Sequence, residues 1–244
     1  MLEEKDELYL NRIEDVPVFQ FDRKVANVFS DMINRSVPGY AEIVKSIITL
    51  SKKYAMENTK IYDLGCSLGA VSVGLKTSLD VKNVSIYGVD NSLSMLNKAI
   101  YNAKQSVSDV PIYFIHNNIE NINIDNASVV ILNFTLQFIP IEKREALLQK
   151  IYKGLKPGGV LILSEKVQFS NRYFNDVVDD LHCQFKQSKG YSQLEIAQKR
   201  TALEDVMIVE SISTHQKRLE RVGFSFCEVY YQYYNFCSML VYKS

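Results

Sequence analysis

Two glycines stand in a short loop directly after an apolar stretch of the chain. The segment YDLGCSLGA places Asp63, Gly65 and Gly69 around Cys66 and Ser67. Because glycine has no side chain, the backbone N–H groups of such a loop can meet a ligand, with the N-terminus of the next helix behind them. The spacing differs from the GxGxxG of dinucleotide-binding proteins. The segment is therefore either a ligand-binding loop or a tight structural turn.

An acidic residue closes the next apolar stretch. Asp90 ends SIYGVD and is followed by Asn91. A carboxylate about 20 residues beyond a glycine loop is placed to accept both hydroxyls of a ribose. Its alternative role is to cap the helix that starts at NSLSML, although Ser92 can serve as that cap. The loop and the acid together predict an adenosyl ligand.

These residues need strands and helices to position them, and the sequence alternates between the two. Several of the apolar strands are apolar throughout, as expected when helices cover both faces of a sheet. The pattern predicts an α/β fold with a doubly wound, mostly parallel sheet. Strands are expected at 60–64, 85–90, 111–116, 128–134 and 159–166, and helices at 41–54, 69–78, 92–105 and 141–154, with another helix ended by Pro38-Gly39.

Two further regions surround this core. A largely helical insertion precedes the last two strands, and those aromatic strands meet near Tyr234-Asn235 as an antiparallel hairpin. We expect one domain, with an N-terminal helical cap (1–55), a Rossmann-like core (56–166), the helical insertion (167–222) and the hairpin (223–244). The arrangement resembles the class I S-adenosylmethionine-dependent methyltransferases, whose glycine loop holds the methionine part of the ligand. Sheets of this kind bind ligands outside the carboxyl ends of their strands.

Polar residues at two more strand ends extend the resemblance. Methyltransferases commonly carry an Asp after the third strand that accepts from the adenine amino group, where this chain has Asn118 in HNNIENI. The amide carbonyl of Asn can also accept, and Ile119 would pack on the ring. Asn133 closes SVVILNF, where the amino acid end of the ligand would pass. Alternatively, Asn133 is only a polar residue at the end of a strand and has no ligand.

Composition excludes several other classes of protein. Lys+Arg and Asp+Glu both number 28, whereas proteins that bind nucleic acid in bulk usually carry a basic excess. The apolar runs are too short to span a membrane, and the acidic N-terminus has no signal core, so a cytoplasmic location is expected. The chain has no CxxC pair and its three histidines are scattered, so we expect no metal site. In the cytoplasm we expect the thiols to be reduced.

A narrower resemblance covers the chain from about Phe21 to its end. The stretches VFSDMINRSVPGY, GLKPGGVLILSEK and GYSQLEIAQKRTALEDVMI resemble the carboxy-S-adenosylmethionine synthase family. That resemblance implies an enzyme that attaches a carboxyl group to the methyl group of S-adenosylmethionine. Prephenate would be the donor and phenylpyruvate the by-product. The product would serve a separate enzyme that carboxymethylates tRNA wobble uridine, so no direct contact with nucleic acid is expected. The family also implies a homodimer.

The resemblance also assigns individual residues. Arg200, in EIAQKR, would hold the new carboxylate, since a guanidinium grips a carboxylate with two hydrogen bonds; its alternative is a solvated charge beside Lys199. Tyr40 would contact S-adenosylmethionine, although an aromatic at a helix start more often packs. Arg35 would offer a second cation to prephenate. Cys66 is expected to be a small neutral filler of the loop whose backbone N–H matters more than its sulfur.

Three other functions compete with carboxyl transfer. A conventional methyltransferase for a small molecule would share the loop, Asp90 and the sheet, but would leave no new anion for Arg200 to hold. A binding module would store or deliver the ligand without turnover. An NAD-dependent dehydrogenase is disfavoured because GxGxxG spacing is absent. No catalytic base is assigned, and the substrate itself can serve.

Overall fold

Seven strands form one mixed sheet in the order β3-β2-β1-β4-β5-β7-β6. The computed structural model describes residues 4–244. Strands β1 to β5 are parallel, and β7 is antiparallel to both β5 and β6. The strands are β1 (Lys60–Leu64), β2 (Ser85–Asp90), β3 (Ile112–His116), β4 (Ala127–Asn133), β5 (Leu155–Lys166), β6 (Phe226–Tyr233) and β7 (Phe236–Tyr242).

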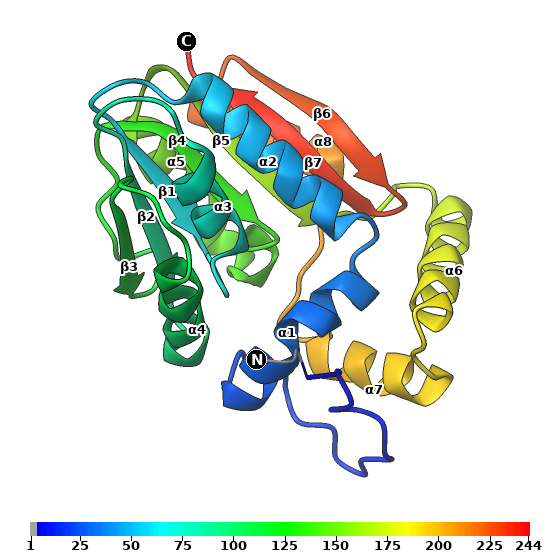
Figure 1. Ribbon diagram of the computed structural model, residues 1–244. Coiled ribbons are helices and arrows are strands. Elements are labelled where there is room, and N and C mark those ends of the chain that lie inside the picture. The colour runs from blue at the N-terminus through cyan, green and yellow to red at the C-terminus, as the bar shows by residue number, and fades with distance from the viewer. Residues whose placement is uncertain (1–3) are drawn as a thin grey trace.

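Helices cover both faces of the sheet, which explains the uninterrupted apolar strands. On one face, α2 (Tyr40–Tyr54) and α3 (Ala70–Ser78) bury an apolar cluster against the central strands, and α4 (Leu93–Lys104) packs beside α3. On the other face, α5 (Ile141–Gly154) and α8 (Ile212–Val222) bury a second cluster. The resulting three layers are seen in Figure 1.

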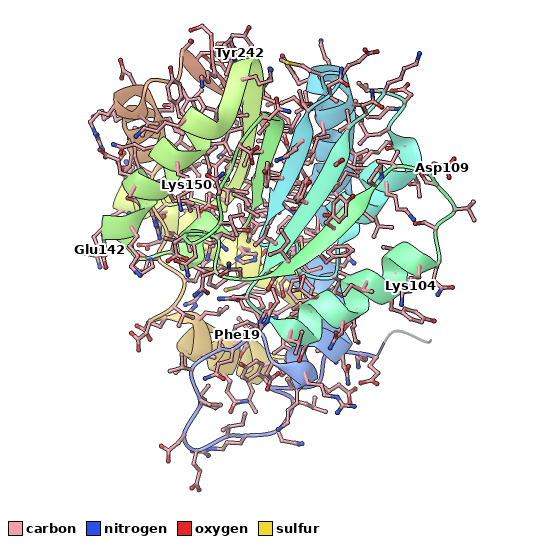
Figure 2. The ribbon with its side chains drawn as sticks, turned by 90° about the vertical axis from the view of Figure 1, so that its left-hand side faces the viewer. Phe19, Lys104, Asp109, Glu142, Lys150 and Tyr242 are labelled. Carbon is pink, nitrogen blue, oxygen red and sulfur yellow. The ribbon has the colours of Figure 1, made fainter. Side chains whose placement is uncertain are left out.

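The remaining elements gather beyond the carboxyl ends of the parallel strands (Figure 1). They are α1 (Arg23–Ser36), α6 (Arg172–Ser188), α7 (Gln193–Leu203) and the segment before α1. A third apolar cluster joins Phe19 of that segment, Val25 of α1, Met95 of α4 and Ala202 of α7. In Figure 2, Phe19 lies far from Tyr242, which pairs with Val160 near the amino end of the sheet. The N-terminal segment therefore lies on the side where such sheets bind ligands.

The predicted fold class is confirmed, including the helical insertion and the C-terminal hairpin. One strand boundary was wrong: β5 begins at Leu155, before the Pro157-Gly158-Gly159 turn, because Leu155 already pairs with Ala127 of β4. Within the expected cap, α1 lies beyond the strand ends while α2 packs on the sheet. Residues 1–3 of that cap lie outside the described residues.

Candidate active site at the carboxyl ends of the strands

The glycine loop follows β1, but its N–H groups are not open as the sequence suggested. The N–H groups of Gly65 and Cys66 donate to the carbonyl of Val89, at 2.7 and 3.0 Å, and that of Gly69 donates to the carbonyl of Cys66. The N–H group of Ser67 donates to Asp90. Three of these donors hold the loop to β2, and the fourth, from Gly69, closes the loop on itself. Ligand binding by Gly65, Cys66 and Ser67 stays a prediction.

Asp90 joins the loop to the end of β2. One carboxylate oxygen accepts from the Ser67 N–H at 2.9 Å and the other from the Ser92 N–H at 2.8 Å. Ser92, not Asp90, is the N-cap of α4, because its hydroxyl accepts from the N–H of Met95. Burial raises the pKa of Asp90, and the two backbone donors oppose that rise. Each carboxylate oxygen keeps a second acceptor position, so Asp90 can still accept from a ligand hydroxyl.

Asp63 is a second buried carboxyl group at this edge, for which no role was predicted. Its side chain accepts from the Ser72 hydroxyl at 2.6 Å. Burial raises its pKa to about 6. The phenol of Tyr40 lies near enough that the charge of Asp63 adds to burial in raising its pKa. Tyr40, predicted to contact the ligand, is thus placed beside the end of β1.

Asn91, predicted to bind the cofactor beside Asp90, contacts Asn118, which is predicted to lie on the adenine side. The side-chain amide of Asn91 donates to the carbonyl oxygen of Asn118 at 3.1 Å. A ring nitrogen of His116 lies 3.0 Å from the backbone oxygen of Asn91. Ile119 is buried in the apolar cluster under α5. The carbonyl oxygen of Asn118 can accept a second hydrogen bond, so the pair still offers an acceptor beyond the end of β3.

Asn133, the last residue of β4, carries a buried oxygen with an unmet hydrogen bond. Within the described part of the chain, its Oδ1 has no partner. Buried polar atoms without partners are rare and costly in folded proteins. A ligand ammonium group at this strand end would satisfy that oxygen. Together with the Asp90 carboxylate, this orphaned acceptor fits the amino acid and ribose ends of S-adenosylmethionine.

Cys66 is buried beneath the loop, 5% exposed. Burial raises the pKa of its thiol well above the usual value. Its sulfur would lie 3.1 Å from a side chain placed at Gly88 of β2. A neutral thiol packed in this way acts as a space-filling group and not as a nucleophile.

The two arginines named from the sequence occupy different environments. Arg200 is exposed on α7, and its Nη2 lies 3.4 Å from the Cys183 sulfur of α6. Arg35 is buried, donates to the carbonyls of Asp6 and Lys189, and stacks on the Tyr191 ring at 3.8 Å. Its Nε and Nη1 therefore tie the N-terminal segment to α1 and the insertion, while its Nη2 has no partner among residues 4–244.

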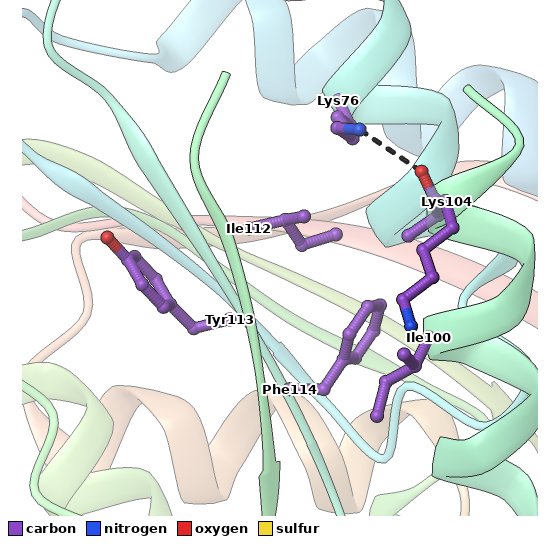
Figure 3. A pocket seen from close by; sticks show the side chains of 7 residues that line it. Lys76, Ile100, Lys104, Ile112, Tyr113 and Phe114 are labelled. Atoms are coloured by element: carbon purple, nitrogen blue, oxygen red, sulfur yellow. Dashed lines mark hydrogen bonds between the residues drawn. The ribbon is translucent and has the colours of Figure 1, made fainter. Parts of the chain in front are cut away.

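One hollow of the surface lies away from these strand ends. Figure 3 shows a hollow of about 390 Å³ between α3, α4 and the edge strand β3, lined by Lys76, Ile100, Lys104 and Phe114 among others. The Lys76 ammonium donates to the carbonyls of Ala103 and Ser106, at 3.1 and 3.0 Å. This hollow holds none of the polar strand-end residues and is not the candidate site.

Two negative findings concern residues 4–244. No group of three or more His, Cys, Asp or Glu side chains there could hold a metal ion. In the same residues, no helix combines the length and the apolar character that a membrane crossing requires.

The chain is similar to solved structures with a methyltransferase fold and to curated enzymes of a narrower family. Residues 61–159 match the methyltransferase domain family model. A putative S-adenosyl-L-methionine-dependent methyltransferase from Methanococcus maripaludis is 21% identical, covers 96% of this chain and 98% of its own, and has a TM-score of 0.61. The magnesium protoporphyrin IX methyltransferase of Synechocystis with bound SAH is 16% identical, covers 87% of both chains and has a TM-score of 0.60. These structures show the fold.

Curated relatives are much more similar. The carboxy-S-adenosyl-L-methionine synthase of Shewanella piezotolerans is 48% identical over 100% of both chains. The synthase of the same name from Histophilus somni is 48% identical over 98% of this chain and 99% of its own. Identity of this extent over whole chains confirms the resemblance predicted from the sequence. The chain belongs to the carboxy-S-adenosyl-L-methionine synthase family and is an S-adenosylmethionine-dependent transferase.

Proposed function

We propose that this enzyme converts S-adenosylmethionine to carboxy-S-adenosylmethionine, with prephenate as the carboxyl donor and phenylpyruvate as the by-product. We further propose that the product supplies the carboxymethyl modification of tRNA wobble uridine by a separate enzyme. The observation that carries the proposal is Arg200. It is an exposed cation on the insertion whose charge acts on Lys166 at the end of β5, in a chain 48% identical to proteins named for carboxy-S-adenosyl-L-methionine synthesis.

The residues at the strand ends would bind S-adenosylmethionine in three parts. Asp90, held by the N–H groups of Ser67 and Ser92, would accept from the ribose hydroxyls. The orphaned Oδ1 of Asn133 would accept from the ammonium group. Asn118 and Ile119 would meet the adenine, while Tyr40 and the loop would line the methionine part. When bound, the sulfonium makes its methyl hydrogens acidic. Prephenate can supply the carboxyl group because its ring becomes aromatic as that group and the ring hydroxyl leave together, and the hydroxyl with the methyl proton forms water.

Arg200 would separate carboxyl transfer from methyl transfer. A guanidinium can hold the carboxylate of the product by two charge-assisted hydrogen bonds, whereas plain S-adenosylmethionine has no anion in that position. Such bonds contribute about 1.5–3 kcal/mol each when shielded from water. Because Arg200 is exposed, solvent screening reduces this gain. We expect Arg200→Leu to lower the affinity for the carboxylated product by about tenfold and to change the affinity for S-adenosylmethionine little.

The experiment that tests the proposal is turnover by the purified protein with S-adenosylmethionine and prephenate, followed by mass spectrometry. We expect a product heavier than S-adenosylmethionine by one carbon dioxide, together with an equal amount of phenylpyruvate. Omission of prephenate is the control and should leave S-adenosylmethionine unchanged. Formation of S-adenosylhomocysteine with a methylated acceptor, or tight ligand binding without turnover, would contradict the proposal.

A further inference from the structure

Three cations meet where β5 ends against the helical insertion. Lys166 is the last residue of β5, Lys186 lies in the last turn of α6, and Arg200 lies in the last turn of α7. The Arg200 guanidinium contacts Cys183, which is one turn before Lys186 on α6. Burial lowers the pKa of Lys186 to about 8, with Lys166 and Arg200 adding to that fall and Cys183 and Asp179 opposing it.

Neither lysine has a partner for its ammonium group. Among residues 4–244, no hydrogen bond or ion pair joins the Nζ of Lys166 or of Lys186 to another group, although both side chains are half-buried. The carboxylate that acts on both is Asp179, and it is already engaged. Its oxygens accept from the side-chain amides of Asn235 at 3.0 Å and Asn175 at 3.3 Å.

The neighbouring histidine adds no compensating or opposing charge. A ring nitrogen of His182 lies 2.8 Å from the Ser36 carbonyl. Burial lowers its pKa to about 3, so it is neutral at physiological pH. Three cations facing one carboxylate leave a surplus of two positive charges. Because the two lysines of this surplus are half-buried, it is costly unless an anion enters it.

The strand register places this cluster beside the candidate site. Asn133 of β4 pairs with Ser164 of β5, and Lys166 is two residues further along. Since side chains two apart on a strand share a face, Lys166 lies on the same face as Ser164 and just beyond the strand end where Asn133 lies. An anion bound by the lysines would thus lie next to a ligand held by Asn133.

The surplus matches a dicarboxylate. We propose that Lys166 and Lys186 bind the carboxylate that the donor keeps, while Arg200 binds the carboxyl group that is transferred. This inference rests on the proposed function, because it takes the donor to be a dicarboxylate such as prephenate. It assigns the two lysines to donor recognition and not to S-adenosylmethionine binding.

The test compares Lys166→Met and Lys186→Met with the matched control Lys45→Met, an exposed lysine on the outer side of α2. Methionine keeps the length of the side chain and removes the charge. We expect each lysine variant to raise the KM for prephenate by about tenfold, since each loses a charge-assisted contact. The dissociation constant of S-adenosylmethionine should stay within about twofold of wild type. Lys186→Arg should recover most of the loss, and thermal unfolding confirms that each variant is folded.

Failure of this inference and failure of the proposed function give different results. Unchanged KM for prephenate in both lysine variants, or a parallel loss of S-adenosylmethionine affinity, would overturn the lysine assignment while wild-type turnover still supported the function. If the wild-type protein shows no turnover, calorimetric titration with prephenate decides the lysine assignment. Binding that the lysine variants lose would support it, and absence of binding to the wild type would overturn it.

Discussion

Asp63 is a buried carboxyl whose own titration should change stability between about pH 4 and pH 6. Its pKa is about 6 in the folded protein, against 3.8 for an unperturbed Asp. Between these values the folded state holds a proton that the unfolded state has lost. The free energy of unfolding therefore falls as pH rises through this window and is constant above it.

Asp63→Asn removes that titration and keeps the shape of the side chain. We expect the variant to be more stable than wild type by about 2–3 kcal/mol above pH 6, and the difference to vanish below about pH 4. Urea unfolding at the two pH values measures this. An equal difference at both would show that the Asp63 charge is not the cause.

Gly65 shows at the residue scale why the loop is glycine-rich. Its φ of +81° is left-handed, and a Cβ there would lie 2.4 Å from the Thr135 hydroxyl. Gly190, with φ of +89°, has its nearest neighbour at 3.6 Å and is the matched control. We expect Gly190→Ala to cost about 1–2 kcal/mol and Gly65→Ala to cost about 1–3 kcal/mol more, measured by urea unfolding. Equal losses would mean that Thr135 moves aside freely.

At the scale of elements, the segment before α1 is held to α7 by a buried charge. Asp6 is 1% exposed, accepts from the Tyr191 hydroxyl, and lies 3.5 Å from the Lys199 ammonium. Lys199 adjoins Arg200 on α7. Because the pair is buried, removing one charge leaves the other without compensation.

Asp6→Asn is therefore expected to lower the free energy of unfolding by about 3 kcal/mol. Glu7→Gln is the control, since Glu7 pairs with Lys5 at the surface and such pairs contribute little. Chemical denaturation of both variants gives the comparison. If Glu7→Gln were as damaging as Asp6→Asn, the buried network would not be what holds the segment.

The elements themselves were largely predictable, because strand and helix periodicity is local. The strand-end residues Asp90, Asn118 and Asn133 followed from the same pattern, since carboxyl ends of parallel strands share an edge. The hydrogen bonds of the loop were not predictable, as its N–H groups pair with Val89 and Asp90 of another strand. Nor was the burial of Arg35, which depends on Lys189 and Tyr191 about 150 residues away. The cluster of Lys166, Lys186 and Arg200 was not predictable either, because its place beside Asn133 depends on the register of β4 and β5.

At the scale of the whole molecule, apolar side chains remain exposed on α6 and on the edge strand β6. Tyr173 and Phe174 of α6 are 79% and 49% exposed, and Tyr233 of β6 is 41% exposed. Tyr233 lies beside α6, since its ring is 6.4 Å from that of Phe185. Exposed apolar groups on neighbouring elements of this kind mark interaction surfaces. We propose that they contribute to a homodimer, and we expect light scattering to give twice the 28.0 kDa chain mass. A single-chain mass at all concentrations would contradict this.

The proposed function requires the enzyme to transfer a carboxyl group and not a methyl group. A single turnover with prephenate labelled with ¹³C in its ring carboxylate, followed by mass spectrometry of the adenosyl product, tests this. We expect the label to appear in a carboxylated S-adenosylmethionine and the phenylpyruvate to be unlabelled. A product without the label, or S-adenosylhomocysteine in its place, would contradict it.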